Sequence, residues 1–196
     1  MRTIKHITFA SLFVLYSFIS NGQDKTIDSL KNVLQTKKDD VSNVNTLNEL
    51  SWKFLMKSDI SNAMNFANRA LKLAQKIGFK KGYGTAYYNI GSIYHTQNKI
   101  PEAIRNYSIA LKIQQEVGDK KGIAESYVSF GQIYLFSEHN EAEAVRNFSN
   151  AITIQEEIDD KKGLAESYLN FGSIYTIQEN DHKALEYFYK TLKIYE

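Results

Sequence analysis

The sequence lacks the residues and motifs on which most catalytic and metal-binding sites depend. It contains no cysteine, which excludes disulfides, thiolate metal sites and a lipid-modified cysteine anchor. It also has no phosphate-binding glycine-rich loop, no pair of histidines at metal-binding spacing and no nucleophile motif. His95, His139 and His182 each stand alone near an expected helix end and are interpreted as turn or surface residues. We therefore expect no enzymatic activity, no metal and no cofactor.

The sequence also lacks a large excess of positive or negative charge. The formal net charge is +2, from 24 basic and 22 acidic residues. Residues 1–22 contain Arg2 and Lys5 and no acidic residue, so the remaining chain has 22 basic and 22 acidic residues. A protein that binds a nucleic acid or an anionic membrane needs a basic surplus. The balance therefore argues against both kinds of partner.

The longest apolar run lies at the N-terminus and is short. It covers 13 positions, residues 7–19, and follows Arg2, Lys5 and His6; the small or polar residues 20–22 come after it. A membrane-spanning helix needs about 20 apolar residues, whereas this layout is typical of a secretory signal peptide. We expect cleavage after residue 22 and a secreted or periplasmic protein. The alternative is an uncleaved anchor that holds the chain to the outer face of a membrane.

From residue 24 onward the apolar residues recur at helical spacing. A first amphipathic helix is expected over 24–37, within a capping segment, 23–39, that covers the first face of the following domain. A second helix is expected over 40–56, and a third ends at Ile77, because Gly78 occupies the usual position just past a helix end. Either Asp59 or Ser61 is the expected cap of the third helix.

One stretch then occurs three times. Its copies are GYGTAYYNIGSIY from Gly82, GIAESYVSFGQIY from Gly122 and GLAESYLNFGSIY from Gly163. Within them Gly91, Gly131 and Gly172 are spaced by 40 and 41 residues, and Ser51 stands 40 residues before Gly91. A glycine inside a helix costs about 1 kcal/mol relative to alanine. Its repetition at one site predicts that a neighbouring helix approaches closely there.

Further repeated residues make the pattern specific. They are aromatic residues on either side of each glycine and alanine or aromatic residues in the following helix: Tyr87, Tyr127, Tyr168, Tyr94, Tyr134, Tyr175, Ala103, Tyr107, Ala110, Ala144, Phe148, Ala151, Ala184 and Phe188. The pattern resembles the tetratricopeptide repeat over residues 44–196. The chain departs from that pattern by having tyrosine for the first tryptophan, no proline near the repeat end, and Thr191 for alanine. The repeated aromatic residues are expected in the core.

The resemblance implies an all-α, right-handed superhelical solenoid of antiparallel helix hairpins with a concave inner surface. We expect four hairpins, over about 40–78, 79–118, 119–159 and 160–196, with the last incomplete. The period exceeds the usual length of about 34 residues. The extra residues lie between Ala110 and Tyr127, where they should lengthen both helices. One additional residue in SEHNEAEA, from Ser137, should only enlarge a turn.

Each joint between hairpins carries a pair of lysines. The joints read GFKKG from Gly78, GDKKG from Gly118 and DDKKG from Asp159, and Asp119 and Asp160 are suitable helix caps there. The lysines should form a row along one edge of the solenoid. The favoured interpretation is a solvated edge balanced by nearby aspartates, and the alternative is an anion-binding strip.

Function is expected on the inner surface, which the resemblance assigns to the first helix of each hairpin. The candidate ligand-binding residues are Tyr88, Asn89, Ser92, Glu125, Ser129, Gln132, Glu166, Asn170 and Ser173. A row of amides such as Asn89 and Asn170 can pair with the backbone of an extended peptide, although the same side chains can bond within the scaffold instead. Glu125 and Glu166 argue against the basic clamp on a peptide carboxylate that some family members use.

Trp52 allows two interpretations. An exposed indole in a groove is a common anchor for a binding partner. The favoured interpretation places Trp52 in the core, against the helix expected over 24–37. Only the first makes Trp52 part of a binding surface.

Two functions follow from these observations. The first is a non-catalytic scaffold that binds a protein or an extended peptide on its concave surface. The alternative is a truncated N-terminal sensory ectodomain of a membrane-bound regulator, either a histidine kinase or a transcription regulator. Because Leu192 to Glu196 aligns with Leu111 to Gln115, before the expected end of that helix, we also expect that the uncapped C-terminal end can self-associate.

Overall fold

The computed structural model describes residues 25–34 and 39–196, and every regular element in these ranges is an α-helix. A short helix over 25–34 comes first. The other helices are α2 (Val41–Met56), α3 (Ile60–Ile77), α4 (Lys80–Thr96), α5 (Ile100–Val117), α6 (Lys120–Phe136), α7 (Glu141–Glu157), α8 (Lys161–Ile177) and α9 (Asp181–Tyr195). The expected signal peptide, residues 1–22, lies outside the described residues. None of the helices in the described part of the chain is long and apolar enough to cross a membrane.

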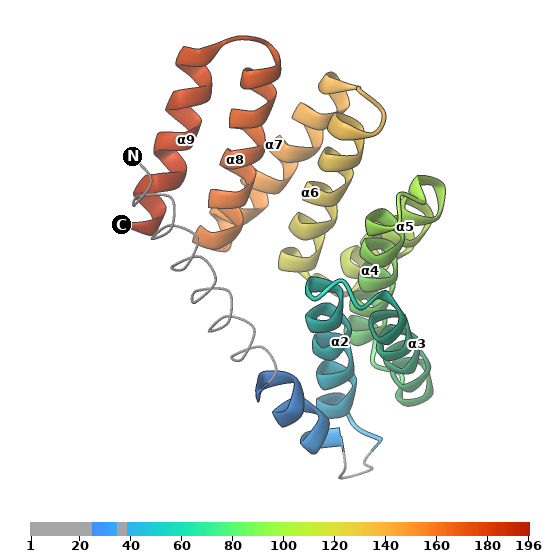
Figure 1. Ribbon diagram of the computed structural model, residues 1–196. Coiled ribbons are helices and arrows are strands. Elements are labelled where there is room, and N and C mark those ends of the chain that lie inside the picture. The colour runs from blue at the N-terminus through green and yellow to red at the C-terminus, as the bar shows by residue number, and fades with distance from the viewer. Residues whose placement is uncertain (1–24, 35–38) are drawn as a thin grey trace, which may run out of the picture.

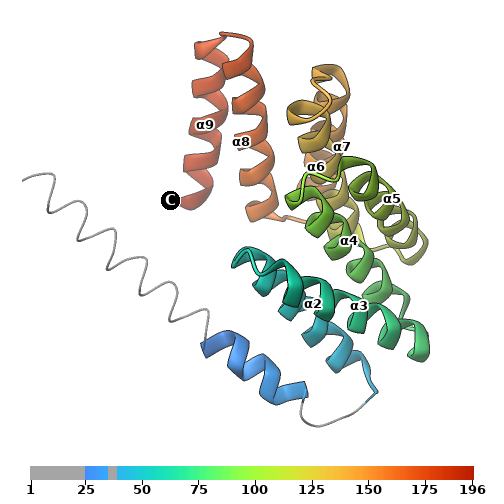
Figure 2. The ribbon, with the colours of Figure 1, turned by 45° about the vertical axis from the view of Figure 1, so that its right-hand side comes forward.

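The helices form four antiparallel hairpins that stack in chain order (Figure 1). The hairpins are α2–α3, α4–α5, α6–α7 and α8–α9, and the second helix of each packs against the first helix of the next. Figure 2 shows the stack from a second direction, with α2 and α3 at one end and α8 and α9 at the other. This arrangement confirms the predicted all-α solenoid. The helices α5 and α6 have 18 and 17 residues, which accounts for the long period.

The helix over 25–34 packs against the first hairpin, beside α2 in Figure 1. Ile27 is buried in the same cluster as Leu47, Leu50 and Phe54. The Nζ atom of Lys31 lies 5.3 Å from the centroid of the Phe54 ring. This helix therefore covers apolar surface that the first hairpin would otherwise expose.

The repeated glycines mark the closest contacts inside the hairpins. A Cβ atom added to Gly91 would lie 2.7 Å from the Tyr107 ring, and one added to Gly131 would lie 2.5 Å from the Phe148 ring. Real Cβ atoms do not approach rings so closely, so only glycine allows these two helices to pack in register. The predicted close approach is confirmed, and an aromatic side chain of the second helix makes it.

The joints between hairpins depend on a left-handed backbone residue. Gly78 has φ 71° and Gly118 has φ 67° at the ends of α3 and α5. The third joint has Asp159 in the same position, with φ 52°. Glycine adopts this backbone conformation without strain, whereas in a residue with a Cβ atom the Cβ comes too close to the backbone and raises the free energy. The third joint is therefore strained where the first two are not.

Two of the predicted caps are present and one is wrong. The carboxylates of Asp59 and Asp160 accept hydrogen bonds from the backbone N–H groups of Asn62 and Gly163. Asp119 makes no side-chain cap hydrogen bond. Its carboxylate instead lies 3.1 Å from the Nζ atom of Lys81, because the ammonium group of the preceding joint competes for it.

The lysines at the joints are exposed, and several of them are paired. Lys80 contacts Glu116 at 3.6 Å, and Lys120 forms an ion pair with Glu157. These contacts favour the solvated-edge interpretation. The additional residue near Ser137 lies in the turn between α6 and α7, as predicted.

The repeated aromatic residues are not all in the core. Tyr107 and Phe148 are fully buried, but Phe188, which occupies the same position in α9, is 38% exposed. Leu185, Tyr189 and Leu192 are also exposed along α9. In α7 the corresponding side is covered by α8, whereas no described helix covers that side of α9. The prediction was therefore wrong for Phe188.

Candidate functional site

A cavity of about 470 Å³ lies between the first helices of the hairpins. We call it the central cavity; its lining residues are Asn45, Asn48, Glu49, Trp52, Thr85, Tyr88, Asn89, Lys121, Glu125, Val128, Gln155, Asp160, Lys162, Gly163 and Glu166. They come from α2, α4, α6 and α8, with Gln155 from α7 and Asp160 from the joint before α8. Because one cavity is bounded by α2 and by α8, the stack of first helices curves around it.

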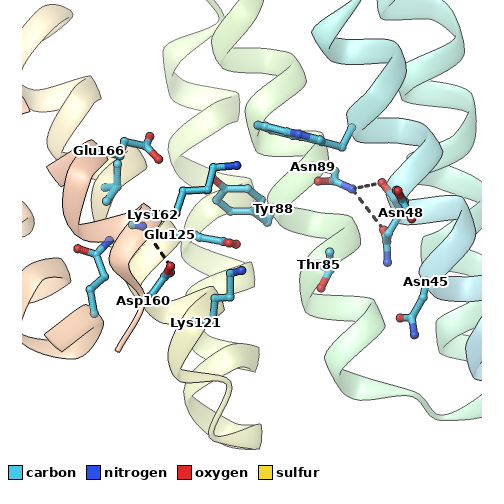
Figure 3. Close-up of a pocket in the computed structure, with 15 residues that line it drawn as sticks. Asn45, Asn48, Thr85, Tyr88, Asn89, Lys121, Glu125, Asp160, Lys162 and Glu166 are labelled. Atoms are coloured by element: carbon cyan, nitrogen blue, oxygen red, sulfur yellow. Dashed lines mark hydrogen bonds between the residues drawn. The ribbon is translucent and has the colours of Figure 1, made fainter. Parts of the chain in front are cut away.

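One repeat position lines the central cavity in all four hairpins. Asn45, Thr85, Glu125 and Glu166 each stand six residues before the repeated glycine, or before Ser51 in the first hairpin. In Figure 3 the side chains of Glu125 and Glu166 lie on one side of the Tyr88 ring, and those of Asn45 and Thr85 lie on the other. The inner surface is therefore built on this position, which we call the inner row.

Four of the nine predicted ligand-binding residues line the central cavity. They are Tyr88, Asn89, Glu125 and Glu166, whereas Ser92, Ser129, Gln132, Asn170 and Ser173 do not. The predicted residues stand mostly at or near the glycine, about one helical turn beyond the inner row. Periodicity identifies the correct helix face, but it does not show which turn along that face stays open.

The serines among the predicted residues are used inside the scaffold. Ser92 donates to the Tyr88 carbonyl at 3.1 Å and accepts a hydrogen bond from the Tyr107 hydroxyl at 3.1 Å. The hydroxyl groups of Ser129 and Tyr88 lie 3.1 Å apart and join α4 to α6. Ser173 donates to the carbonyl of Leu169 in its own helix. Ser129 therefore joins two first helices, Ser92 joins the two helices of its hairpin, and Ser173 bonds within its own helix.

The amides of Asn89 and Asn170 also have partners within the chain. The Asn89 side-chain amide donates to the backbone carbonyl of Asn48 at 3.0 Å, and the Asn48 amide donates to the carbonyl of Gly82 at 3.0 Å. Asn170 donates to the carbonyl of Glu166 at 3.0 Å, and both asparagines are buried. Of the two interpretations of this pair, the geometry favours the bonds within the scaffold.

Trp52 is not a core residue. Its side chain is 39% exposed and lines the central cavity. The favoured sequence interpretation was therefore wrong, because Phe54, two residues further along α2, occupies the side that faces the helix over 25–34. Two residues correspond to about 200° around a helix, so Trp52 points to the opposite side.

The central cavity contains more acidic than basic groups. Glu49, Glu125, Asp160 and Glu166 supply four carboxylates, and Lys121 and Lys162 supply two ammonium groups. Desolvation by the surrounding protein raises the pKa of the Glu125 carboxyl, which Lys121 opposes and the neighbouring Asp119, Asp160 and Glu166 reinforce. Desolvation likewise raises the pKa of Glu166, against the opposing effect of Lys162.

Several lining residues were missed by the sequence interpretation. Lys121 and Lys162 were assigned to the outer edge, and Asp160 was assigned only to capping. Lys121 and Lys162 precede Glu125 and Glu166 by four residues, and this spacing, one helical turn, is the signal that places them on the same face. Across the part of the chain that the structure describes, no group of three or more histidine or acidic side chains is arranged to hold a metal ion.

Comparison with known proteins agrees with the repeat pattern. A family model of the tetratricopeptide repeat matches residues 83–145 and 135–196. No curated protein matches the chain in sequence.

Solved structures share the fold. The structure resembles the apo form of RapI (TM-score 0.68, 20% identity), with 92% of this chain and 66% of that chain covered. It also resembles BtubC from P. vanneervenii (TM-score 0.63, 20% identity, 78% and 63% covered). For MamA the TM-score is 0.54 and the identity 22%, with 90% of each chain covered. This chain therefore spans less than two thirds of RapI and of BtubC. The repeated residues, the stacked hairpins and the family model together show that the chain belongs to the tetratricopeptide repeat family.

Proposed function

We propose that the chain is a non-catalytic scaffold that binds a peptide segment of a partner protein in its central cavity. The family is a protein-interaction scaffold, which supports the general class. The observation that carries the finer proposal is that side chains from the first helices of all four hairpins line one cavity. A ligand in it would contact the whole stack, so its affinity would depend on the repeat arrangement.

The inner row also supports this site. The inner row holds three different residue types, asparagine, threonine and two glutamates, although the positions that pack the hairpins are repeated. A side chain needed only for stacking would be constrained to one type by its repeated surroundings. Variation of the cavity wall on a repeated scaffold is what a specific binding surface requires.

A peptide-display selection tests the proposal. Peptides selected on the chain should lose binding when the cavity is filled by Thr85→Trp or Asn45→Trp. Ser108→Trp, on an exposed position of α5 outside the cavity, is the matched control and should leave binding unchanged. Selected peptides that bind all three variants equally would contradict the assignment of the site.

A further inference from the structure

We propose that the central cavity binds a basic side chain of the peptide, arginine in preference to lysine. The proposal rests on the proposed function, because it states the chemistry of the segment that the cavity takes up. It is carried by the shape of the cavity, by its unpaired carboxylates and by its aromatic wall.

The charge of the cavity wall is unbalanced. Four carboxylates against two lysines leave a net charge of −2 around a space of about 470 Å³. The chain from residue 23 onward is neutral, with 22 basic and 22 acidic residues, so this surplus is local. Low-dielectric walls concentrate the field of such groups into the cavity. A cationic ligand is therefore favoured over an anionic or neutral one.

Glu125 and Glu166 have no direct ionic partner. The ion pairs among the described residues involve other acids, such as Asp119 with Lys81 and Glu157 with Lys120. Glu125 is half-buried and Glu166 is more exposed, and desolvation is the main cause that raises the pKa of each carboxyl. A carboxylate that has lost hydration without gaining a partner is stabilised when a cation reaches it. These two groups are the expected anionic contacts.

The aromatic wall favours a guanidinium group over an ammonium group. Trp52 is 39% exposed into the cavity, and the half-buried Tyr88 ring lies between the acidic side and the asparagine side (Figure 3). A guanidinium ion is planar, is weakly hydrated on its faces and donates hydrogen bonds from its edge. It can stack on an aromatic face while its edge reaches Glu125 or Glu166. An ammonium ion is more strongly hydrated and gains less from the rings.

Lys121 and Lys162 compete with the ligand. Both are exposed, and their charges act on Glu125 and Glu166, respectively. Neither takes part in an ion pair among the described residues, so each long side chain can move into solvent when a ligand enters. Removal of one of these charges should strengthen the binding of a basic ligand.

The chain contains a single tryptophan, so the fluorescence of Trp52 reports on the central cavity without labelling. We would titrate the chain with acetyl-Ala-Ala-Arg-Ala-Ala-amide and with its citrulline analogue, which keeps the shape of arginine without the charge. The arginine peptide should bind at least about ten-fold more tightly than the citrulline peptide. The lysine peptide should fall between the two.

Charge variants identify the contacts. The double variant Glu125→Gln, Glu166→Gln should reduce arginine-peptide affinity to the citrulline level and leave the citrulline affinity unchanged. Lys162→Met should tighten arginine binding by a few-fold, whereas Lys161→Met, on the neighbouring residue outside the cavity wall, should not. Equal affinity for the two peptides, no binding of either, or an unchanged affinity in the double glutamine variant would each overturn the proposal.

The display selection separates this proposal from the function on which it rests. If the selected peptides depend on an open cavity but are not enriched in arginine, the binding site stands and its basic specificity is wrong. If no selected peptide depends on the open cavity, both fail. Enrichment of arginine among cavity-dependent peptides supports both.

Discussion

The first hairpin and the later hairpins use side chains of different sizes where their two helices meet. In the later hairpins a glycine of the first helix faces an aromatic ring of the second, as Gly131 faces Phe148. In the first hairpin the corresponding residues are Ser51 and Ala67, both fully buried. The hydroxyl group of Ser51 donates to the Ala63 carbonyl at 2.9 Å. Serine and alanine together are smaller than glycine and phenylalanine, so the first hairpin joins its helices here with two small side chains and a hydroxyl–carbonyl hydrogen bond instead of a glycine under a ring.

The largest expected effect comes from removing the aromatic ring that faces a repeated glycine. Phe148→Ala should lower the free energy of unfolding by about 4 kcal/mol, because it leaves a cavity beside Gly131. Adding Gly131→Ser should recover about 1 kcal/mol, since the pair then has the composition of Ser51 and Ala67 and the new hydroxyl can reach the carbonyl of Ala144. Urea titration followed by circular dichroism measures both. A double variant no more stable than Phe148→Ala would show that the serine hydroxyl does not make the hydrogen bond seen in the first hairpin.

The next largest effect comes from replacing the glycine that faces the ring. Gly131→Ala should destabilise the chain by about 2 to 3 kcal/mol, because the overpacking against the Phe148 ring exceeds the gain in helix propensity. Gly172→Ala should cost less, about 1 kcal/mol, since Phe188 is 38% exposed and can move aside. Thermal unfolding of the two variants gives the comparison. Equal losses at both sites would show that the exposure of the facing ring is not what decides the cost.

The smallest effect compares the joints. Asp159→Gly should stabilise the chain by about 0.5 to 1 kcal/mol, because φ 52° is strained for aspartate and not for glycine. The reverse change, Gly118→Asp, should destabilise by a similar amount at φ 67°. Urea titration of both variants checks the signs. A loss of stability in Asp159→Gly would mean that the aspartate side chain makes a contribution larger than the strain.

The sequence predicted the fold well because repeat packing is local and periodic. Gly78 marks the end of α3 because its backbone is left-handed, and Gly91 marks a close contact inside its hairpin because the facing ring leaves no room for a side chain. The exposure of an aromatic ring at the end of the stack cannot be predicted from the repeat pattern. Phe188 has the residue type of a core position, and its exposure depends on what packs beyond α9.

The candidate site was less predictable than the fold. Glu125 and Glu166 were assigned to the inner surface by their helix face, but Asn89 and Asn170 have the same face and are buried in scaffold hydrogen bonds. Trp52 was placed wrongly because its neighbour Phe54 carries an equally strong apolar signal. Which turn of each first helix remains open depends on the curvature of the stack, and that is a property of several hairpins together.

The most direct test of the account maps the ligand contact by amide correlation NMR. A peptide from the display selection would be titrated into the labelled chain. The account predicts that the largest shifts fall on the inner row, Asn45, Thr85, Glu125 and Glu166, together with the indole of Trp52. Shifts concentrated on the outer helices α3, α5 and α7, with the inner row unchanged, would contradict it.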